Sequence, residues 1–347
     1  MNRSLRLLAA CFVCGIIICA LPASAADRGS YKLLQKINLP GDGGWDYLTF
    51  DAASNHLFIS RATHVMVVDP GSGKVAGDIP NTPGVHGIAL ANKFNKGFIS
   101  NGRGNDVTVF DLKTLKEVAH VPTGERPDAI IFDPATNRVF AMNGKSGSVT
   151  AINAKDNTVA GTVELGGTPE FAAADGKGHV YVNLEDKSKI AALDSRNLKL
   201  LSTWDLSPCQ EPSGLAMDRV HRRLFAGCDN KMMAIVDADS GKVIATPPIG
   251  DGVDANGFDP GKAVAFSSNG EGTLTIVHEV SPSEFKVVQN VETQRGARTM
   301  AVDPKSHKVY LVTASFGEKP APTAENPNPR PPFLPNSFVL LVVGPEK

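Results

Sequence analysis

The sequence of 347 residues is poor in features that would point to several common classes of protein. Apolar residues at helical spacing are almost absent, which argues against a helical bundle or a coiled coil. Positive charge is not in excess, because 35 Lys and Arg stand against 36 Asp and Glu, for a formal net charge of −1. Aromatic residues make up only 6% of the chain. Nucleic-acid binding normally uses a basic stripe and stacking aromatics, so a nucleic-acid partner is not expected.

Signature motifs of several enzyme classes are also missing. The sequence contains no Gly-x-Ser-x-Gly nucleophile elbow and no C-x-x-C-H haem attachment motif. The pair His278-Glu279 has no second His at helical spacing, so it is not a zinc protease motif. These absences leave open whether the chain is an enzyme.

The one long apolar run stands at the N-terminus. Arg3 and Arg6 precede an apolar run over residues 7–21, and Ala23-Ser24-Ala25 follows it. This order is typical of a secretory signal peptide, so residues 1–25 are predicted to be removed. Residues 26–347 should then form a single periplasmic or secreted domain. A membrane anchor would need about 20 apolar residues, so no membrane span is expected in the mature chain.

Cysteine is rare, and its placement predicts one disulfide bond. Three of the five cysteines lie within residues 1–25, which leaves Cys209 and Cys228. The residues between them read as a strand, a turn and a strand, and an antiparallel hairpin brings its two ends together. An even pair in an oxidising compartment favours a disulfide. Two free thiols are the alternative, whereas a redox-active pair is disfavoured because this segment has no C-x-x-C motif.

The sequence is rich in turns, with 33 Gly and 24 Pro, and a repeated unit organises them. Residues 127–168 contain four short runs rich in β-branched and aromatic residues, DAIIFD, RVFAMN, SVTAIN and TVAGTVEL. Each run is separated from the next by a turn of the type PATN, GKSG or AKDN. Such runs predict consecutive antiparallel strands, so the unit is expected to be a four-stranded meander.

Seven copies of this unit follow one another along the chain. Their first strands end at Phe50-Asp51, Leu90-Ala91, Phe132-Asp133, Ala174-Asp175, Met217-Asp218, Phe258-Asp259 and Val302-Asp303. The last copy lacks a fourth strand, and residues 31–41 resemble a fourth strand without its first three. Pairing the two ends would close a ring and remove an exposed sheet edge. The predicted fold is therefore an all-β, seven-bladed β-propeller with four-stranded antiparallel blades, and we expect it to be a monomer.

The ends of the second strands indicate a family. Val180-Tyr181-Val182-Asn183 is similar to the YVTN repeat, as are residues 98–101 and 140–143, and VxVxD strands follow them. The mature chain resembles the secreted YVTN, or YncE-like, β-propellers over its whole length. The resemblance implies the propeller fold but not one function, because related propellers bind varied partners. Blades five and six depart from the Asn signature.

One copy is interrupted by a proline-rich insertion, residues 317–336. Its composition predicts an extended or polyproline segment in place of the hairpin between strands two and three of blade seven. It is interpreted either as a lid over the channel or as a loop without a specific role.

Chargeable residues recur where the innermost strands begin, which is the usual place for a propeller ligand. Four carboxylates, one imidazole and one guanidinium share this register: Asp46, His86, Asp128, Glu170, Asp254 and Arg298. Converging carboxylates raise one another's pKa unless a cation neutralises them. The set is interpreted either as the wall of a hydrated channel or as a ligand site. As a divalent-metal site it would use Asp46, His86, Asp128, Glu170 and Asp254.

A second polar tier is expected from the hairpins between strands two and three on the same face. Its members are Arg61, His64, Asn101, Arg103, Asn143, Asn183, Glu185, Asn230 and Glu271. The asparagines are explained by turn chemistry. Arg61, Arg103 and Glu185 are not, and with Arg298 they are predicted to hold a small anionic or sugar-like ligand.

Two functions follow from this pattern. The first is an extracytoplasmic binding or scaffold module that presents its channel mouth to a protein, a cell-surface polymer or a small molecule. The alternative is a metal-dependent hydrolase, similar in architecture to lactonase propellers, with Glu170 or Asp254 as the catalytic base.

Overall fold

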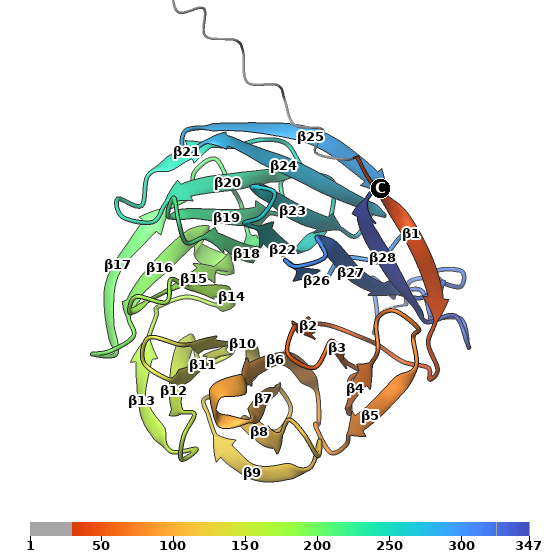
Figure 1. Cartoon of the computed structure of the whole chain (residues 1–347), viewed down its shortest axis with the longest axis horizontal. Coiled ribbons are helices and arrows are strands. Elements are labelled where there is room, and N and C mark those ends of the chain that lie inside the picture. Colours follow the sequence, from red (N-terminus) through yellow and green to blue (C-terminus); the bar gives the residue numbers. More distant parts are fainter. Residues whose placement is uncertain (1–29, 324, 347) are drawn as a thin grey trace, which may run out of the picture.

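The fold is a ring of seven four-stranded antiparallel sheets around a central channel, as the computed structural model in Figure 1 shows. The structure describes residues 30–323 and 325–346. The seven-bladed propeller predicted from the repeat is confirmed. The predicted signal peptide, residues 1–25, lies outside the described residues. No helix in the described part of the chain has the length and apolar character needed to cross a bilayer.

The strands run outward from the channel in chain order, so each blade begins with its innermost strand. Blades one to three contain β2 (Leu48–Asp51), β3 (His56–Ser60), β4 (Val65–Val68) and β5 (Val75–Ile79); β6 (Val85–Ala91), β7 (Lys96–Asn101), β8 (Asp106–Asp111) and β9 (Glu117–Pro122); β10 (Pro127–Asp133), β11 (Arg138–Asn143), β12 (Ser148–Asn153) and β13 (Val159–Glu164). Blades four to six contain β14 (Pro169–Ala174), β15 (His179–Leu184), β16 (Lys189–Asp194) and β17 (Lys199–Asp205); β18 (Pro212–Asp218), β19 (Arg223–Cys228), β20 (Met232–Asp237) and β21 (Val243–Ala245); β22 (Val253–Asp259), β23 (Val264–Asn269), β24 (Thr273–Ser281) and β25 (Glu284–Glu292). Two short 3-10 turns, η1 (Asn92–Phe94) and η2 (Glu185–Lys187), accompany them.

Blade seven joins the two ends of the chain. It consists of β26 (Met300–Asp303), β27 (Lys308–Thr313), β28 (Val339–Pro345) and the first strand of the domain, β1 (Tyr31–Asn38). β1 pairs with β28 in antiparallel register from Tyr31 opposite Pro345 to Asn38 opposite Val339. The predicted ring closure is therefore confirmed, and this pairing removes the sheet edge that an open array would expose.

Burial explains why the strands are so apolar. The middle strands are covered on both faces by neighbouring blades, so β11 and β12 are buried along almost their whole length. The outermost strands are half exposed, as in β13. The left-handed residues Asn55, Asn95 and Asn137 turn the chain between the first and second strands.

Buried asparagines hold the second strand to the third in three blades. Asn143 Nδ2 donates to Ser148 Oγ at 3.1 Å and to Thr150 Oγ1 at 3.0 Å. Asn101 and Asn269 make equivalent bonds in blades two and six. These asparagines therefore have a packing role inside the sheet rather than the turn role expected from their residue type.

Blade five has a disulfide where those blades have asparagine. Cys228 pairs with Pro212 at the sheet position that Asn101 and Asn143 occupy opposite Val85 and Pro127 in their own blades. It is bonded to Cys209, with the two Cα atoms 5.5 Å apart. The predicted disulfide is confirmed.

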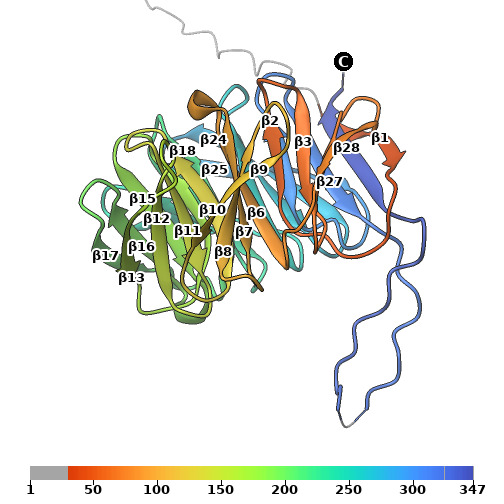
Figure 2. The same cartoon turned by 90° about the horizontal axis from the view of Figure 1, so that it is seen from below.

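The proline-rich insertion leaves the ring between β27 and β28 and extends beyond it as a long arm (Figure 2). Its base is fixed by Trp45, whose ring centroid lies 4.9 Å from that of Phe333 and 6.4 Å from that of Phe316. Farther out, Lys319 Nζ donates to Asn328 Oδ1 within the arm itself. These contacts describe a projecting arm anchored beside blade one.

Candidate functional site

The predicted channel-mouth residues occupy one structural position in successive blades. They are the second residues of β6, β10, β14, β18 and β22, together with two residues that precede β2 and β26: His86, Asp128, Glu170, Ser213, Asp254, Asp46 and Arg298. In each of the five strands the pairing register shifts directly after the first residue. A bulge of this kind re-aims a side chain. The six chargeable side chains are called the acid ring below.

One side of the acid ring is a compact cluster of two carboxylates and an imidazole. His86 Nδ1 lies 2.6 Å from Asp46 Oδ2 and 3.5 Å from Asp128 Oδ1. Burial would lower the pKa of His86, but the hydrogen bond to Asp46 and the charge of Asp128 more than offset it, so the pKa is raised. Burial raises the pKa of Asp128 to about 6, although the nearby His86 opposes this shift.

The opposite side of the acid ring is an ion pair. Arg298 Nε forms a short contact with Asp254 Oδ2, and Ser213 Oγ donates to Asp254 Oδ1 at 3.1 Å. Burial nevertheless raises the pKa of Asp254 above its ordinary value. The single guanidinium of the acid ring is thus already engaged by one carboxylate.

Glu170 is the carboxylate without a neutralising partner. Among the described residues, none donates a hydrogen bond or an ion pair to its side chain. Burial is the main cause that raises its pKa to about 9, and the charges of Asp128, Glu185 and Asp254 add to it. A glutamate in this state holds a proton at neutral pH.

Two stacked aromatic rings lie beneath the acid ring, and sequence reasoning missed them. Tyr47 from blade one stacks on Phe171 from blade four, with centroids 4.4 Å apart and planes at 23°. The Tyr47 hydroxyl is buried without a hydrogen-bond partner. Burial raises the pKa of Tyr47, and the charges of Asp128, Glu170, Asp46 and Asp254 raise it further. Tyr47 and Phe171 also line a cavity of about 930 Å³ along the inner strands, which the acid ring does not line.

The second polar tier is only partly brought to the mouth. Burial raises the pKa of Glu185, and the charges of Glu211 and Asp254 contribute, so Glu185 extends the acidic side. A Cβ on Gly102 would meet His86 Nε2, so this turn lies beside the acid ring, whereas the stem of the Arg103 side chain packs against Gly84.

Arg61, by contrast, is a structural residue. It is only 3% exposed, its guanidinium lies 3.5 Å above the Phe338 ring, and it donates to the carbonyl of Gly41. Burial lowers the pKa of Arg61 to about 10, although the charge of Asp42 opposes this. Arg61 was expected at the channel mouth, but its guanidinium is buried against Phe338 instead.

The other members of this tier make local contacts. Asn183 Nδ2 donates to the carbonyls of Ser213 and Gly214 in the next blade, and Asn230 Nδ2 donates to Pro208. Glu271 accepts a bond from Thr273, and His64 lies 3.7 Å from Asp78.

Chemically, the mouth has more negative than positive charge. Asp46, His86 and Asp128 each offer one ligand atom within 4.8 Å of the other two. Two carboxylate oxygens and one imidazole nitrogen suit a divalent metal such as Zn²⁺ or Mn²⁺. The residues present therefore fit a cation better than an anion.

No family model matches the sequence, and no curated protein sequence matches it significantly. Solved structures match its fold. It is similar to a chain of Kuenenia stuttgartiensis hydrazine synthase, with a TM-score of 0.68 and 15% identity over 79% of this chain and 93% of that chain. It is also similar to the RRP9 WD40 repeats, with a TM-score of 0.74 and 8% identity over 90% of this chain and 100% of that chain. A chain of the mitotic checkpoint complex matches with a TM-score of 0.72 and 14% identity over 95% and 99%. Identities this low establish the propeller fold alone.

Proposed function

We propose that this protein is a binding module whose channel mouth takes up a cationic ligand. The excess of carboxylates in and beside the acid ring carries the proposal. Asp46, Asp128, Asp254 and Glu185 stand against one guanidinium and one imidazole, and the guanidinium is paired with Asp254. Glu170 adds a fifth carboxyl group, which can ionise when a cation binds beside it. A bound cation would offset the burial and the neighbouring negative charges that together raise the pKa of Glu170.

The simplest such ligand is a divalent metal ion held by Asp46, His86 and Asp128. The side chains of these residues are 21%, 22% and 13% exposed, which leaves them accessible from the mouth without full solvation. A larger ligand with an amine or a guanidinium is compatible with the same charge. Both kinds of ligand would bind for the same reason, because their positive charge neutralises the converging carboxylates.

We further propose that the protein works outside the cytoplasm and belongs with the YVTN-type propellers. The Cys209–Cys228 disulfide, the predicted signal peptide and the YVTN-like strand ends support this location. Export of a fusion to alkaline phosphatase, which is active only when oxidised, would test it. Phosphatase activity that does not depend on residues 1–25 would contradict the proposed signal peptide.

Calorimetric titration of chelator-treated protein with Zn²⁺, Mn²⁺, Ca²⁺ and Mg²⁺ tests the binding proposal. At least one metal should bind with a rise in Tm, and the Asp46→Asn/Asp128→Asn variant should lose that binding. Glu164→Gln, which changes an exposed carboxylate on the outermost strand β13, is the matched control and should bind normally. If neither a metal nor an organic polyamine binds the wild type differently from the double variant, the proposal is wrong.

A second candidate is a hydrolase that uses the same mouth. Glu170 favours it, because a buried carboxyl group with a pKa near 9 is suited to donate a proton. A bound divalent ion would supply polarisation of a lactone or ester carbonyl. Asp254, the other catalytic residue considered, is less suited to act as a base because Arg298 and Ser213 engage it. Hydrolysis of a lactone panel that Glu170→Gln abolishes while metal binding persists would favour the enzyme over the binding module.

A further inference from the structure

At the other end of the channel, the inner strands finish in a row of aspartates that receive donors from the next blade. Asn92 Nδ2 donates to Asp51 Oδ1 at 2.8 Å, and Ser195 Oγ donates to Asp133 Oδ2 at 2.7 Å. The same arrangement recurs at two further blade junctions, where the donors are an arginine and a histidine. Arg222 Nη1 lies 3.2 Å from Asp175 Oδ2, and His307 Nδ1 lies 2.7 Å from Asp259 Oδ2.

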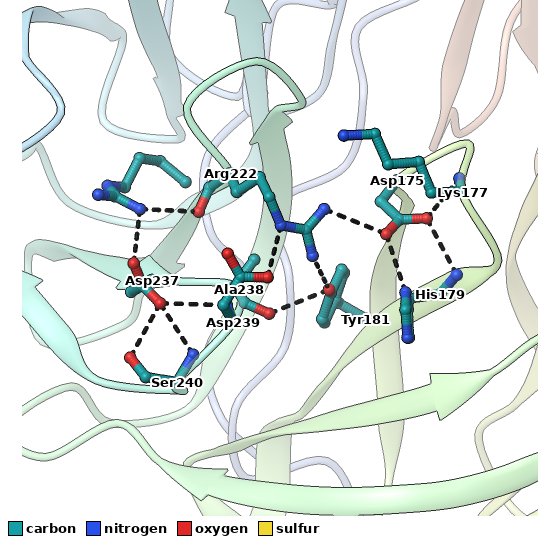
Figure 3. A network of polar contacts seen from close by, with 10 residues as sticks. Asp175, Lys177, His179, Tyr181, Arg222, Asp237, Ala238, Asp239 and Ser240 are labelled. Carbon is teal, nitrogen blue, oxygen red and sulfur yellow. Dashed lines mark hydrogen bonds and ion pairs between the residues drawn. The ribbon is translucent and has the colours of Figure 1, made fainter.

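Figure 3 shows one of these junctions in detail. The Arg222 guanidinium reaches from blade five to Asp175 of blade four and also contacts Asp239 and the Tyr181 hydroxyl. Arg222 sits at a left-handed turn position that His307 also occupies. Each buried aspartate is thus matched by a donor.

The junction between blades five and six departs from this pattern. At the turn position of Arg222 and His307, blade six has Ala263, which has no donor in its side chain. The residue of the third strand that faces this turn is also different, because it is Glu279 in β24. The amide of Ser195 donates to Gly178 of its blade and that of Glu279 to Ala263, so Glu279 holds the position of the donor Ser195. Asp218 therefore faces a second carboxylate instead of a hydroxyl group.

The third member of the cluster is His221, in the turn that follows Asp218. Blades one, three and seven have a hydroxyl residue there, Ser54, Thr136 or Ser306, which donates to the aspartate of its own blade. His221 Nδ1 lies 2.7 Å from Asp218 Oδ2 and 3.0 Å from Glu279 Oε1. The three ligand atoms lie within 4.8 Å of one another.

The buried carboxyl group of Glu279 has no hydrogen-bond donor for either of its oxygens among the residues that the structure describes. Its side chain is only 1% exposed, and its Oε2 is buried with no hydrogen-bond donor. Oε1 approaches His221 without hydrogen-bond geometry. The nearby Arg223 is already used, because it donates to Asp237 at 2.7 Å and to the carbonyl of Pro282. His221 is 44% exposed, so an ion from solvent can reach the cluster.

We propose that Asp218, His221 and Glu279 form a binding site for a divalent transition metal such as Zn²⁺, which joins blades five and six. Two carboxylates and one imidazole nitrogen match the ligand chemistry of this ion, with water completing its coordination. Asp218 is the last residue of β18 and Ser213 is its second, so the site lies about 16 Å from the acid ring, at the opposite end of the channel. It is therefore independent of the proposed ligand site at the mouth.

The test uses full-length protein in which Asp46→Asn and Asp128→Asn have removed the channel-mouth ligands. After chelator treatment, this parent should bind one equivalent of Zn²⁺ in calorimetry, and its Tm should rise with Zn²⁺. Glu279→Ser introduces the residue that blade four has at this position, and His221→Ser the residue of blades one and seven, so both variants should fold. Each should weaken Zn²⁺ binding more than about tenfold and abolish the Tm shift. Glu284→Gln, an exposed glutamate of the outer strand β25, is the control and should bind as the parent does.

A parent that binds no Zn²⁺, or a Glu279→Ser variant that binds it equally well, overturns the proposal. The proposal would also be wrong if Asp218 and Glu279 share a proton and bind no metal. In that case Glu279→Gln stabilises the protein at about pH 8 while Zn²⁺ changes the Tm of neither form. The result does not depend on whether the channel mouth binds a metal, because every variant in this experiment carries Asp46→Asn and Asp128→Asn.

Discussion

Replacing Glu170 by glutamine should stabilise the protein, and the gain should grow with pH. The pKa of Glu170 is raised from 4.5 to about 9 in the fold. In the unfolded chain this carboxyl ionises near its ordinary pKa, so the stability that depends on its protonated form is present below about pH 4.5 and is lost as pH rises toward 9. Glutamine resembles the protonated side chain and removes this loss.

The magnitude follows from the shift. At about pH 7.5 the carboxyl is roughly three pH units above its ordinary pKa, which corresponds to an upper limit of about 4 kcal/mol at 1.36 kcal/mol per unit. Residual solvent access to the mouth reduces this value, so we expect a gain of about 1–3 kcal/mol in the free energy of unfolding. Urea unfolding of chelator-treated wild type and Glu170→Gln at about pH 4.5, 6, 7.5 and 9 measures it.

The control is Glu164→Gln, which should change the free energy of unfolding by less than about 0.5 kcal/mol at every pH. An equal effect of Glu170→Gln at low and high pH would contradict a raised pKa of Glu170, and so would a loss of stability at high pH. Either result would mean that the Glu170 carboxylate is neutralised by a group that the structure does not show beside it.

Three further variants test the fold. Replacing Cys209 and Cys228 by serine should cost about 3 kcal/mol of stability, because the bond closes a loop between residues separated by 19 positions; equal urea midpoints under oxidising conditions would contradict this. Asn143→Ala should cost about 1–3 kcal/mol in thermal unfolding, since it leaves the hydroxyls of the next strand without their donor; an unchanged Tm would show that the bonds carry no net energy. Gly97→Ala should cost about 1–3 kcal/mol in urea unfolding, because its Cβ would lie 2.1 Å from Cζ of the Phe110 ring; a neutral effect would mean that the ring moves freely.

Most of the fold was predictable because each blade repeats the same local pattern. The four runs of residues 127–168 form β10, β11, β12 and β13 at nearly the expected positions. The absent fourth strand of the last copy and the surplus strand expected within residues 31–41 predicted the closure that β1 and β28 make. Repeated turns and strand lengths predict such a structure directly, because every blade has the same four strands and packs against its neighbours in the same way.

The site was predictable only as a set of positions. A common register placed Asp46 through Arg298 around one channel, and the structure brings them there. The register could not reveal that Asp254 takes the only guanidinium while Glu170 has none, because pairing depends on distances across the channel.

Contacts between blades were missed for the same reason. The Tyr47–Phe171 stack joins blades one and four, and Arg61 is covered by Phe338 from blade seven. A sequence scan within one repeat contains no signal for such contacts. The Asp218 cluster was detectable in part, because His221 replaces a hydroxyl residue that recurs at the same position in blades one, three and seven.

An anomalous diffraction map of crystals soaked in Mn²⁺ or Zn²⁺ would show whether the channel mouth binds a cation. We expect a peak between Asp46, His86 and Asp128, which disappears in the Asp46→Asn/Asp128→Asn variant. A map with no peak at the mouth, in crystals that bind the same metal elsewhere, would contradict a cation-binding mouth.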